Sequence, residues 1–201
     1  MATKIHQLRV SKPIRTTSNK DLRTREYLTT SEIDELIKAL RKKSRNPDRD
    51  ICLVTMMFRH ALRVSEAIAL KWDQVDFDGS KLHVNRLKGS EDAVHPITGE
   101  VMRLLRKLKR ENPTSRYIFL SERKSPLTSQ AIYRMLRNIE PFLGWDFPIH
   151  PHMLRHSCGY HLANDGRDLR AIQMYMGHKS INNTVIYTKL SGKQFNNFWR
   201  D

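Results

Sequence analysis

Two short patterns in the chain combine charged side chains in the way that chemistry at a phosphate requires. Arg63 directly follows a long apolar stretch, so its guanidinium is expected at a rigid point where it can hold two phosphate oxygens. Glu66, three residues further on, can pair with Arg63 or with the framework around it. His152 and Arg155 are also three residues apart, which places a base and a cation on one face of a helix. Either pattern alone also fits an ordinary ion pair or helix start.

Two further patterns lie at a turn and near the C-terminal end. Lys88 falls at the turn of an expected hairpin, from which its side chain could deliver a proton into a groove. Tyr187 lies nine residues after His178 and has threonine neighbours, so core packing explains it less well, although a tyrosine on a short helix is most often a packing residue. Four other tyrosines lie in apolar patterns that explain them as packing residues: Tyr117, Tyr133, Tyr160 and Tyr175. Among these tyrosines, the packing explanation is weakest for Tyr187.

Three histidines close together in the sequence raise the alternative of a metal site. His150, His152 and His156 form this group. No acidic residue or cysteine lies at ligand spacing from them, and the charge of Arg155 would oppose a cation. We therefore predict no metal and no other cofactor.

The composition favours a polyanionic partner. Lys and Arg total 36 against 21 acidic residues, a formal charge of +15, which favours association with DNA, RNA or anionic lipid. Lipid is the weaker alternative, because the basic residues are not confined to one amphipathic segment and no apolar run could span a bilayer. Basic residues near the N-terminus have no apolar stretch behind them, so no secretory signal is expected. Cys52 and Cys158 are expected to be free, buried thiols in a reducing cytoplasm.

The elements that must position these side chains are expected to be mostly helices. The spacing from Thr29 to Glu32 is typical of a capped helix start. Residues 50–62 are apolar nearly all round, which indicates a buried helix. Further helices are expected from residues 65, 98 and 128, and over about 152–164, 168–176 and 181–188, with Gly166 and Gly177 as stops.

A small sheet is expected in the middle of the chain. Residues 81–87 alternate with period two, residues 88–92 are turn formers, and residues 94–97 could return as a partner strand. Residues 117–120 fit a short strand or a buried connector. The sequence thus predicts a mainly α protein with a small antiparallel β-sheet (α+β), without a linker that would divide it.

Taken together, the candidate residues resemble the signature of the tyrosine recombinase (phage integrase) family. The order matches, as do the intervals of 92 residues from Arg63 to Arg155, 23 to His178 and nine to Tyr187. The runs 150–159 and 86–88 look especially like the short recombinases that invert the fimbrial switch, the promoter element behind phase variation. The family usually has glycine where this chain has Ala61, a change that we expect to be tolerated.

The resemblance implies an integrase catalytic-domain fold over residues 26–190. Residues 1–25 are expected to be a flexible basic arm where many members carry a clamp domain. The residues expected to contact DNA are Lys4, Arg9, Lys12, Arg15, Lys20, Arg23 and Arg25 in the arm, and Lys179. Residues 191–201 form a tail with Phe195, Phe198 and Trp199, which either docks on a neighbouring protomer or folds back on its own core.

The resemblance also implies a transesterification without metal or nucleotide. Tyr187 attacks a DNA phosphate, forms a 3′-phosphotyrosyl link and releases a 5′-hydroxyl, with His152 taking the phenol proton and Lys88 donating a proton to the leaving oxygen. Charge on the phosphorane is stabilised by Arg63 and Arg155. The expected supporting residues are His178, which bonds a phosphate oxygen, and Glu66, which fixes the framework around Arg63.

The expected partners follow from that reaction. Strand exchange needs two DNA duplexes and, in the family, four protomers acting in pairs, while the free protein could be a monomer. DNA-bending proteins are possible accessories, and the expected location is the cytoplasm, with the nucleoid. Inversion of a DNA segment is the first expectation. Integration or excision of a mobile element, topoisomerase activity of type IB, and an inactive DNA-binding regulator stay open as alternatives.

Overall fold

The computed structural model describes residues 25–86 and 92–189. Lys88, residues 1–24 of the expected arm and the tail from residue 190 lie outside the described residues. In chain order the elements are α1 (Thr30–Lys43), α2 (Pro47–Arg59), α3 (Val64–Ile68), η1 (Trp72–Gln74), β1 (Val75–Asp76), β2 (Lys81–Val84), β3 (Ala93–Pro96), α4 (Gly99–Glu111), α5 (Ser129–Ile139), η2 (Glu140–Phe142), α6 (Pro151–Asn164), α7 (Leu169–Met176) and α8 (Asn182–Lys189).

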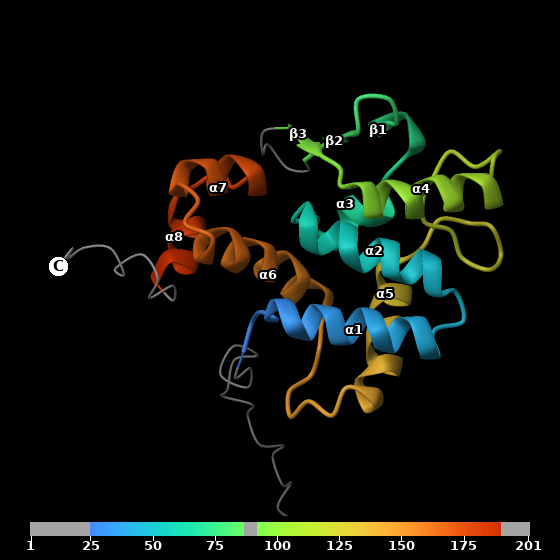
Figure 1. The fold of residues 1–201 in the computed structure, drawn as a ribbon, viewed down its shortest axis with the longest axis horizontal. Helices are drawn as coiled ribbons and strands as arrows, with labels where there is room; N and C mark the ends of the chain where they lie inside the picture. Colours follow the sequence, from blue (N-terminus) through green and yellow to red (C-terminus); the bar gives the residue numbers. More distant parts are fainter. Residues whose placement is uncertain (1–24, 87–91, 190–201) are drawn as a thin grey trace, which may run out of the picture.

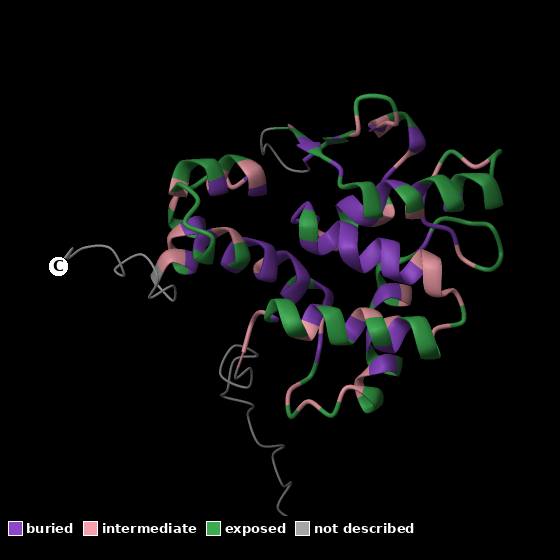
Figure 2. Cartoon of the chain, viewed as in Figure 1, coloured by how far each residue is buried: buried purple, intermediate pink, exposed green. Residues whose placement is uncertain are grey.

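Helix α2 forms the centre of the fold. Every residue from Asp50 to Phe58 is buried, which confirms the buried helix expected over 50–62. Helices α1, α4 and α6 pack around it (Figures 1 and 2). A helix that is apolar all round needs such enclosure, because any exposed side would leave apolar surface in water. The turn after α2, which leads into Arg63, is therefore held from several directions.

The predicted sheet is present and lies beside α4, at the top of Figure 1. It is antiparallel in the order β1-β2-β3, with Leu82 opposite His95 and His83 opposite Val94. Leu82 and Val84 are buried while Lys81 and His83 are exposed, the period-two pattern expected of a half-buried strand. Strand β2 ends at Val84, three residues earlier than the alternation suggested.

The helix boundaries follow the local signals in the sequence. The side chains of Thr29 and Glu32 each bond the other's backbone N–H at the start of α1, which confirms the capping pattern. Gly166 and Gly177, after α6 and α7, have φ angles of +75° and +63°, a region that glycine enters without steric cost. Helices α6, α7 and α8 lie within about one residue of the predicted ranges.

The sequence-based expectations were wrong at two places. Arg25 is anchored rather than part of a free arm, since both terminal nitrogens bond the carboxylate of Glu32 at 2.7 Å. Tyr133 is half exposed on α5, whereas Tyr187 is only 1% exposed, so the tyrosine assigned to packing and the one assigned to chemistry have the opposite burial. The helix expected from residue 65 is present as α3, which begins at Val64 with Arg63 as its N-cap residue.

Other expectations concern the cysteines and the membrane. Cys52 and Cys158 are both free and buried, as predicted. Burial raises the pKa of the Cys158 thiol to about 12, which keeps it protonated. In the two described ranges, no helix has the length and apolar character needed to cross a lipid bilayer.

Two buried histidines connect α2, the sheet and α7. His60 and His95 are each 1% exposed, with ring centroids 5.6 Å apart, and His95 stacks on Tyr175 at 3.8 Å. Neither ring nitrogen of His60 has a hydrogen-bond partner among the described residues. Burial, followed by the charges of His95, Arg59 and Arg86, lowers the pKa of His60 to about 3. His60 is therefore neutral in the folded chain at neutral pH.

We predict that His60→Leu makes the protein more resistant to acid. The unfolded chain takes up a proton at His60 below a pKa of about 6.5, whereas the folded chain does not until about pH 3, so wild-type stability falls over this window. Through this proton uptake, the wild-type protein should lose roughly 2 kcal/mol of its free energy of unfolding between pH 7.5 and pH 5, and His60→Leu should not show this loss. Urea unfolding at both pH values measures it, with exposed His83→Leu as the control. Parallel pH curves for wild type and His60→Leu would refute the prediction.

Candidate active site

The predicted site residues come from four separate parts of the fold. Arg63 precedes α3, directly after the central helix. His152 and Arg155 lie in the first turns of α6, His178 follows α7, and Tyr187 is on α8. The structure brings them together where the end of α2, α6, α7 and α8 meet, in the left half of Figure 1.

A group of buried charges, which we call the guanidinium network, supports this site. It consists of Glu66, Arg86, Arg155 and the carbonyl of Ala61. That carbonyl accepts a short hydrogen bond from Arg155 and one of 3.2 Å from Arg86. Arg86 also bonds Glu66 at 2.8 Å, and Arg155 lies 3.9 Å from the same carboxylate oxygen. One carbonyl and one carboxylate therefore fix two guanidiniums.

Both guanidiniums are also bonded to the C-terminal end of α7. Arg86 donates to the carbonyl of Tyr175 at 2.7 Å and Arg155 to that of Met176 at 2.7 Å. Carbonyls at a helix end lack partners within the helix, so they suit cations. A Cβ at Gly177 would lie 2.9 Å from Nε of Arg86, so glycine there is required for space as well as for its φ of +63°.

Glu66 is the acceptor that joins the network to Arg63. Its carboxylate accepts from the backbone N–H of Arg63 at 2.9 Å and from the Arg63 guanidinium at 2.5 Å. Burial by itself would raise the pKa of Glu66, but these bonds and the charge of Arg86 outweigh it and lower the pKa. The pairing of Arg63 with Glu66 expected from their spacing is thus present, and Arg63 keeps 32% of its side chain exposed for an incoming anion.

The burial of Arg155 decides which substitutions can probe it. Burial, then the charges of Arg63 and Arg86, lowers the pKa of Arg155 to about 10, so it stays charged at neutral pH. It is 2% exposed and its bonds go to backbone carbonyls. Truncating it would leave the Met176 carbonyl without this partner and would remove one of the two guanidiniums on the Ala61 carbonyl. Breaking buried charged contacts of this kind typically costs about 3–5 kcal/mol.

Tyr187 is enclosed by α6 and by rings. A Cβ at Gly159 would lie 2.6–2.8 Å from its ring carbons, so the ring packs on the backbone of α6 one turn after Arg155. Tyr160 meets it edge-on at 5.2 Å and His178 lies parallel to it at 6.2 Å between centroids. Burial raises the pKa of the Tyr187 phenol above its ordinary value, with the charge of Arg155 acting in the opposite direction. The phenol is neutral and needs a proton acceptor to react.

The hydroxyl of Tyr187 bonds to His156, and not to the expected His152. Its oxygen lies 2.9 Å from Nδ1 of His156. His152 is exposed at the start of α6 and meets the His156 ring edge-on, with centroids 4.5 Å apart. His178 bonds the hydroxyl of Thr184 at 2.9 Å through its own Nδ1, which orients its ring.

These three histidines are held in their neutral forms. Burial, followed by neighbouring cationic groups, lowers the pKa of His156 to about 3 and that of His178 to about 4, and it lowers the pKa of His152. An anion bound beside them would reverse the effect of the neighbouring charges. The site therefore has an excess of positive charge and, within the described residues, lacks a negative group that would balance it.

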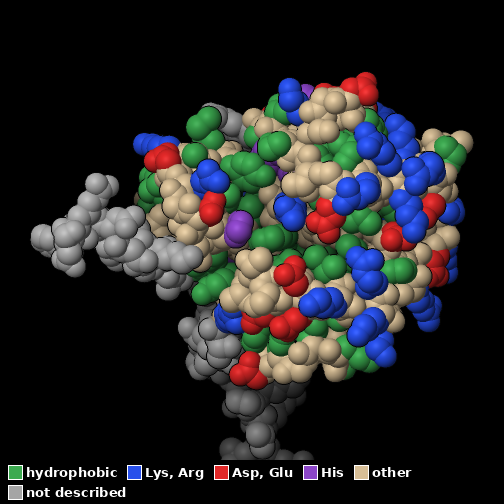
Figure 3. Space-filling view, in the orientation of Figure 1, with side chains coloured by type: hydrophobic (Ala, Val, Ile, Leu, Met, Phe, Trp, Pro, Cys, Tyr) green, Lys and Arg blue, Asp and Glu red, His purple; other side chains and the backbone are tan. Residues whose placement is uncertain are grey.

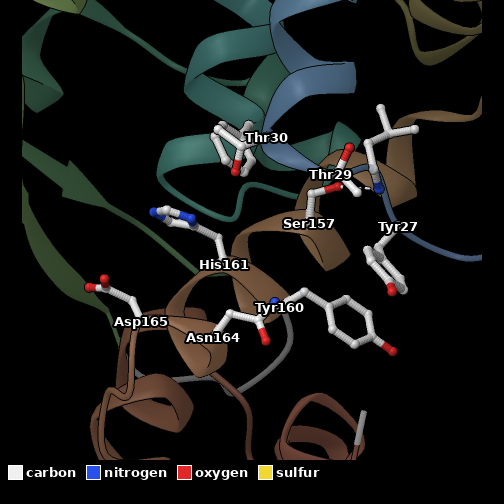
Figure 4. A pocket seen from close by; sticks show the side chains of 10 residues that line it. Tyr27, Thr29, Thr30, Ser157, Tyr160, His161, Asn164 and Asp165 are labelled. Carbon is white, nitrogen blue, oxygen red and sulfur yellow. Dashed lines mark hydrogen bonds between the residues drawn. The ribbon is translucent and has the colours of Figure 1, made fainter. Parts of the chain in front are cut away.

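The remaining site predictions have different outcomes. Lys179 is exposed, as a DNA contact must be, but its role is untested. Within the described residues no three His, Cys, Asp or Glu side chains converge as a metal ion requires. A cavity of about 380 Å³ lies beside α6, lined by Tyr27, Ser157, Tyr160 and His161 among others (Figure 4). None of the predicted catalytic residues lines this cavity, so the presence of a cavity does not identify the catalytic site.

Two residues of the site were given no catalytic role in the sequence analysis. Arg86 and His156 lie beside predicted residues, in the runs that carried the family resemblance. Their spacing gave no reason to separate them from other polar residues. Their contacts are visible only in the structure. The Arg86 side chain is 0% exposed and pairs with Glu66, and Nδ1 of His156 bonds the Tyr187 hydroxyl.

The family is established by comparison with known proteins. Residues 26–194 match the phage integrase family, and the chain belongs to this family of tyrosine-type site-specific recombinases. Its relatives include the type 1 fimbriae regulatory proteins FimB and FimE of Escherichia coli strain K12. They are 35% and 34% identical to it over 89% and 87% of this chain and 92% and 91% of their own. The tyrosine recombinase XerC of Lacticaseibacillus casei is 31% identical over 83% of this chain and 58% of its own.

Solved structures confirm the fold. XerA recombinase superposes with a TM-score of 0.75 at 27% identity, over 87% of this chain and 65% of XerA. XerH in a post-cleavage complex with its difH substrate gives 0.74 at 21% identity, over 90% of this chain and 54% of XerH. The catalytic domain of bacteriophage HP1 integrase gives 0.63 at 22% identity, over 85% and 90%. The predicted integrase catalytic-domain fold is thus confirmed, while this chain spans only part of the XerA and XerH chains.

We predict that Ala61→Gly stabilises the protein. Ala61 has a φ angle of +50°, a left-handed conformation that costs an alanine about 1–2 kcal/mol, and glycine avoids this cost. The greater freedom of glycine in the unfolded chain offsets part of the gain, which leaves about 0.5–1 kcal/mol in the free energy of unfolding. Urea unfolding measures it. Ala171→Gly, on an exposed face of α7, is the control and should destabilise by a similar amount; a loss in both variants contradicts the prediction.

Proposed function

We propose that this protein cuts and rejoins DNA at two specific sites through a covalent bond to Tyr187, and that the result is inversion of the DNA between them. The observation that carries the proposal is the meeting of Tyr187 with Arg155 and His178, from elements far apart in the sequence. Arg63 adds a partly exposed cation at the same place. A phenol, fixed cations and neutral imidazoles are the groups that phosphoryl transfer to tyrosine uses.

In the proposed reaction, one P–O bond forms as another breaks. The Tyr187 oxygen attacks phosphorus, its proton passes to a base, and the 5′-oxygen leaves with a proton from Lys88, which lies outside the described residues. Arg63 and Arg155 stabilise the charge on the phosphorane oxygens, and His178 bonds one of them. The phosphotyrosyl link keeps the energy of the broken bond, so the 5′-hydroxyl of a second duplex can displace the phenol without a nucleotide.

Inversion is supported by the relatives that match the chain almost from end to end. FimB and FimE align over more than nine tenths of their own length, whereas XerC aligns over 58%. The resemblance to fimbrial-switch recombinases implies inversion, acting as four protomers on two duplexes in the cytoplasm. XerH is described as bound to its difH substrate, which supports double-stranded DNA as the partner here.

The charge distribution supports DNA contact without marking its path. Lys and Arg are scattered over the face seen in Figure 3, where α1, α2 and α4 lie, with Asp and Glu between them. Contacts to phosphates by a chain of net charge +15 should weaken steeply with salt. The specific contribution of the site must come from the fixed guanidiniums rather than from this diffuse charge.

We predict that Tyr187→Phe abolishes a covalent DNA adduct that the wild-type protein forms. Nicked duplexes that carry the recombination site, mapped by searching for repeats beside the gene, should trap wild-type protein as an adduct that survives denaturing electrophoresis, because the nicked strand diffuses away. Phenylalanine fills the same space but cannot attack phosphorus. Equal adduct from wild type and Tyr187→Phe contradicts the proposal.

Matched variants separate chemistry from binding. Tyr133→Phe changes a half-exposed tyrosine and should leave the adduct unchanged. Arg63→Gln should lower the cleavage rate far more than the affinity for DNA, because its guanidinium serves the phosphorane. Arg63 suits this test better than the buried Arg155, whose removal would disturb the fold. A variant that lost only affinity would indicate a DNA-binding protein without chemistry.

We predict that the orientation of two sites decides the product in favour of inversion. A plasmid with two recombination sites in inverted orientation should yield the flipped segment, read by polymerase chain reaction across its ends. The same sites as direct repeats should yield little excised circle. If excision predominates, the protein serves a mobile element, and relaxation of any plasmid by a single protomer would indicate a topoisomerase.

A further inference from the structure

The oxygen that would attack DNA already has a hydrogen-bond partner in the folded protein. The Tyr187 hydroxyl lies 2.9 Å from Nδ1 of His156, on the next turn of the same helix face as His152. Within the described ranges, no hydrogen bond joins Tyr187 to His152, and His152 reaches Tyr187 only through the ring of His156. His152, the base predicted from the sequence, is therefore separated from Tyr187 by the ring of His156.

We propose that His156 takes the proton of Tyr187 during DNA cleavage and returns it when the strand is rejoined. The inference rests on the proposed function, because it names the proton acceptor of that same reaction. His156 is then a catalytic residue, since it touches the reacting oxygen. His152 becomes a group on the rim that faces the phosphate.

The packing around Tyr187 favours this assignment, because it fixes the direction of the phenol. The ring rests on the backbone at Gly159, with the edge of Tyr160 on one side and His178 lying parallel to it. Tyr187 is 1% exposed and Arg155 is 2% exposed, so both groups lie inside the fold and the direction of the phenol is set by this packing.

The protonation state of His156 suits an acceptor that works only with DNA present. Its pKa of about 3 keeps the ring neutral, and a phenol that donates to Nδ1 requires the tautomer with the hydrogen on Nε2. After burial, the pKa is lowered by the charge that His152 would carry if protonated, by the charge of Arg155, and by His150 and His178 in the same way as His152. A bound phosphate would neutralise those charges and raise the basicity of His156 when the nucleophile needs it.

The protons balance over the two steps. In cleavage, the phenol oxygen bonds to phosphorus, the phenol proton moves to Nδ1 to give an imidazolium, and the 5′-oxygen leaves with the proton that the proposed reaction takes from Lys88. In rejoining, the 5′-hydroxyl of the second duplex forms the new bond to phosphorus and gives its proton back to Lys88. The phenol leaves and recovers its proton from His156, so no other co-reactant is consumed.

The test is single-turnover cleavage of the nicked duplex by His156→Ala at saturating protein. Loss of a proton acceptor should slow cleavage about 10²–10³-fold, while the affinity for DNA changes little. Imidazole added to the solution should restore much of the rate, because His156 is only partly buried and its removal opens a space beside the phenol. The fall in rate on the acidic side of the wild-type pH profile should disappear in this variant.

Further variants separate proton transfer from positioning. His156→Asn places an amide near the position of Nδ1, where it can bond the phenol but cannot take a proton. A merely positioning role predicts that asparagine restores cleavage, which would overturn the inference, as would faster cleavage by His156→Ala. His161→Ala, on another face of α6, is the matched control and should cleave like wild type. If His156→Ala does not fold, cleavage by His156→Asn provides the test.

The failure of this inference is distinguishable from the failure of the proposed function. If Tyr187→Phe forms the adduct, the proposed function is wrong. If Tyr187→Phe forms none but His156→Ala cleaves at the wild-type rate, only the role of His156 is wrong. If imidazole rescues His152→Ala and not His156→Ala, the acceptor is His152, as first predicted from the sequence.

Discussion

The site depends on a buried excess of positive charge that one carboxylate holds in place. Glu66 bonds both Arg63 and Arg86, and Arg155 lies 3.9 Å away. Placing the buried guanidiniums of Arg86 and Arg155 and the partly exposed one of Arg63 around one carboxylate is favourable only because backbone carbonyls, above all that of Ala61, accept further N–H groups. The turn after α2 and the end of α7 are thereby joined through side chains, and an incoming anion meets a preorganised field rather than flexible surface cations.

That excess of charge also explains the state of the neutral groups around it. Burial, and after it the charge that protonation would add beside Arg155 and its neighbours, lowers the pKa values of His156 and His178. The same field would stabilise a phenolate, yet burial outweighs it at Tyr187 and raises its pKa. A bound anion would act on both, since it would supply the missing negative charge.

The fold and the site differ in how closely they follow the family. Structures with about 21–22% identity share the arrangement of helices, with TM-scores of 0.63–0.74. Ala61 shows how a local departure from the family is tolerated. Its φ angle of +50° explains why the family usually has glycine at this position, and the contacts of the Ala61 carbonyl hold the alanine in that conformation. The presence of a cavity is a poor guide to the catalytic site, since none of the predicted catalytic residues lines the cavity in Figure 4.

The sequence by itself determined the elements and the family, because periodicity, caps and glycine stops act over a few residues and the order of Arg63, His152, Arg155, His178 and Tyr187 is specific. The capping at Thr29, the buried α2 and the antiparallel pairing of β2 with β3 all followed from local patterns. Only the tertiary structure decided the burial of Tyr187, the bond from its hydroxyl to His156 and the central place of Arg86. The physical reason is that burial and hydrogen bonding between distant segments depend on how helices pack, and no spacing along the chain encodes which ring nitrogen a phenol will reach.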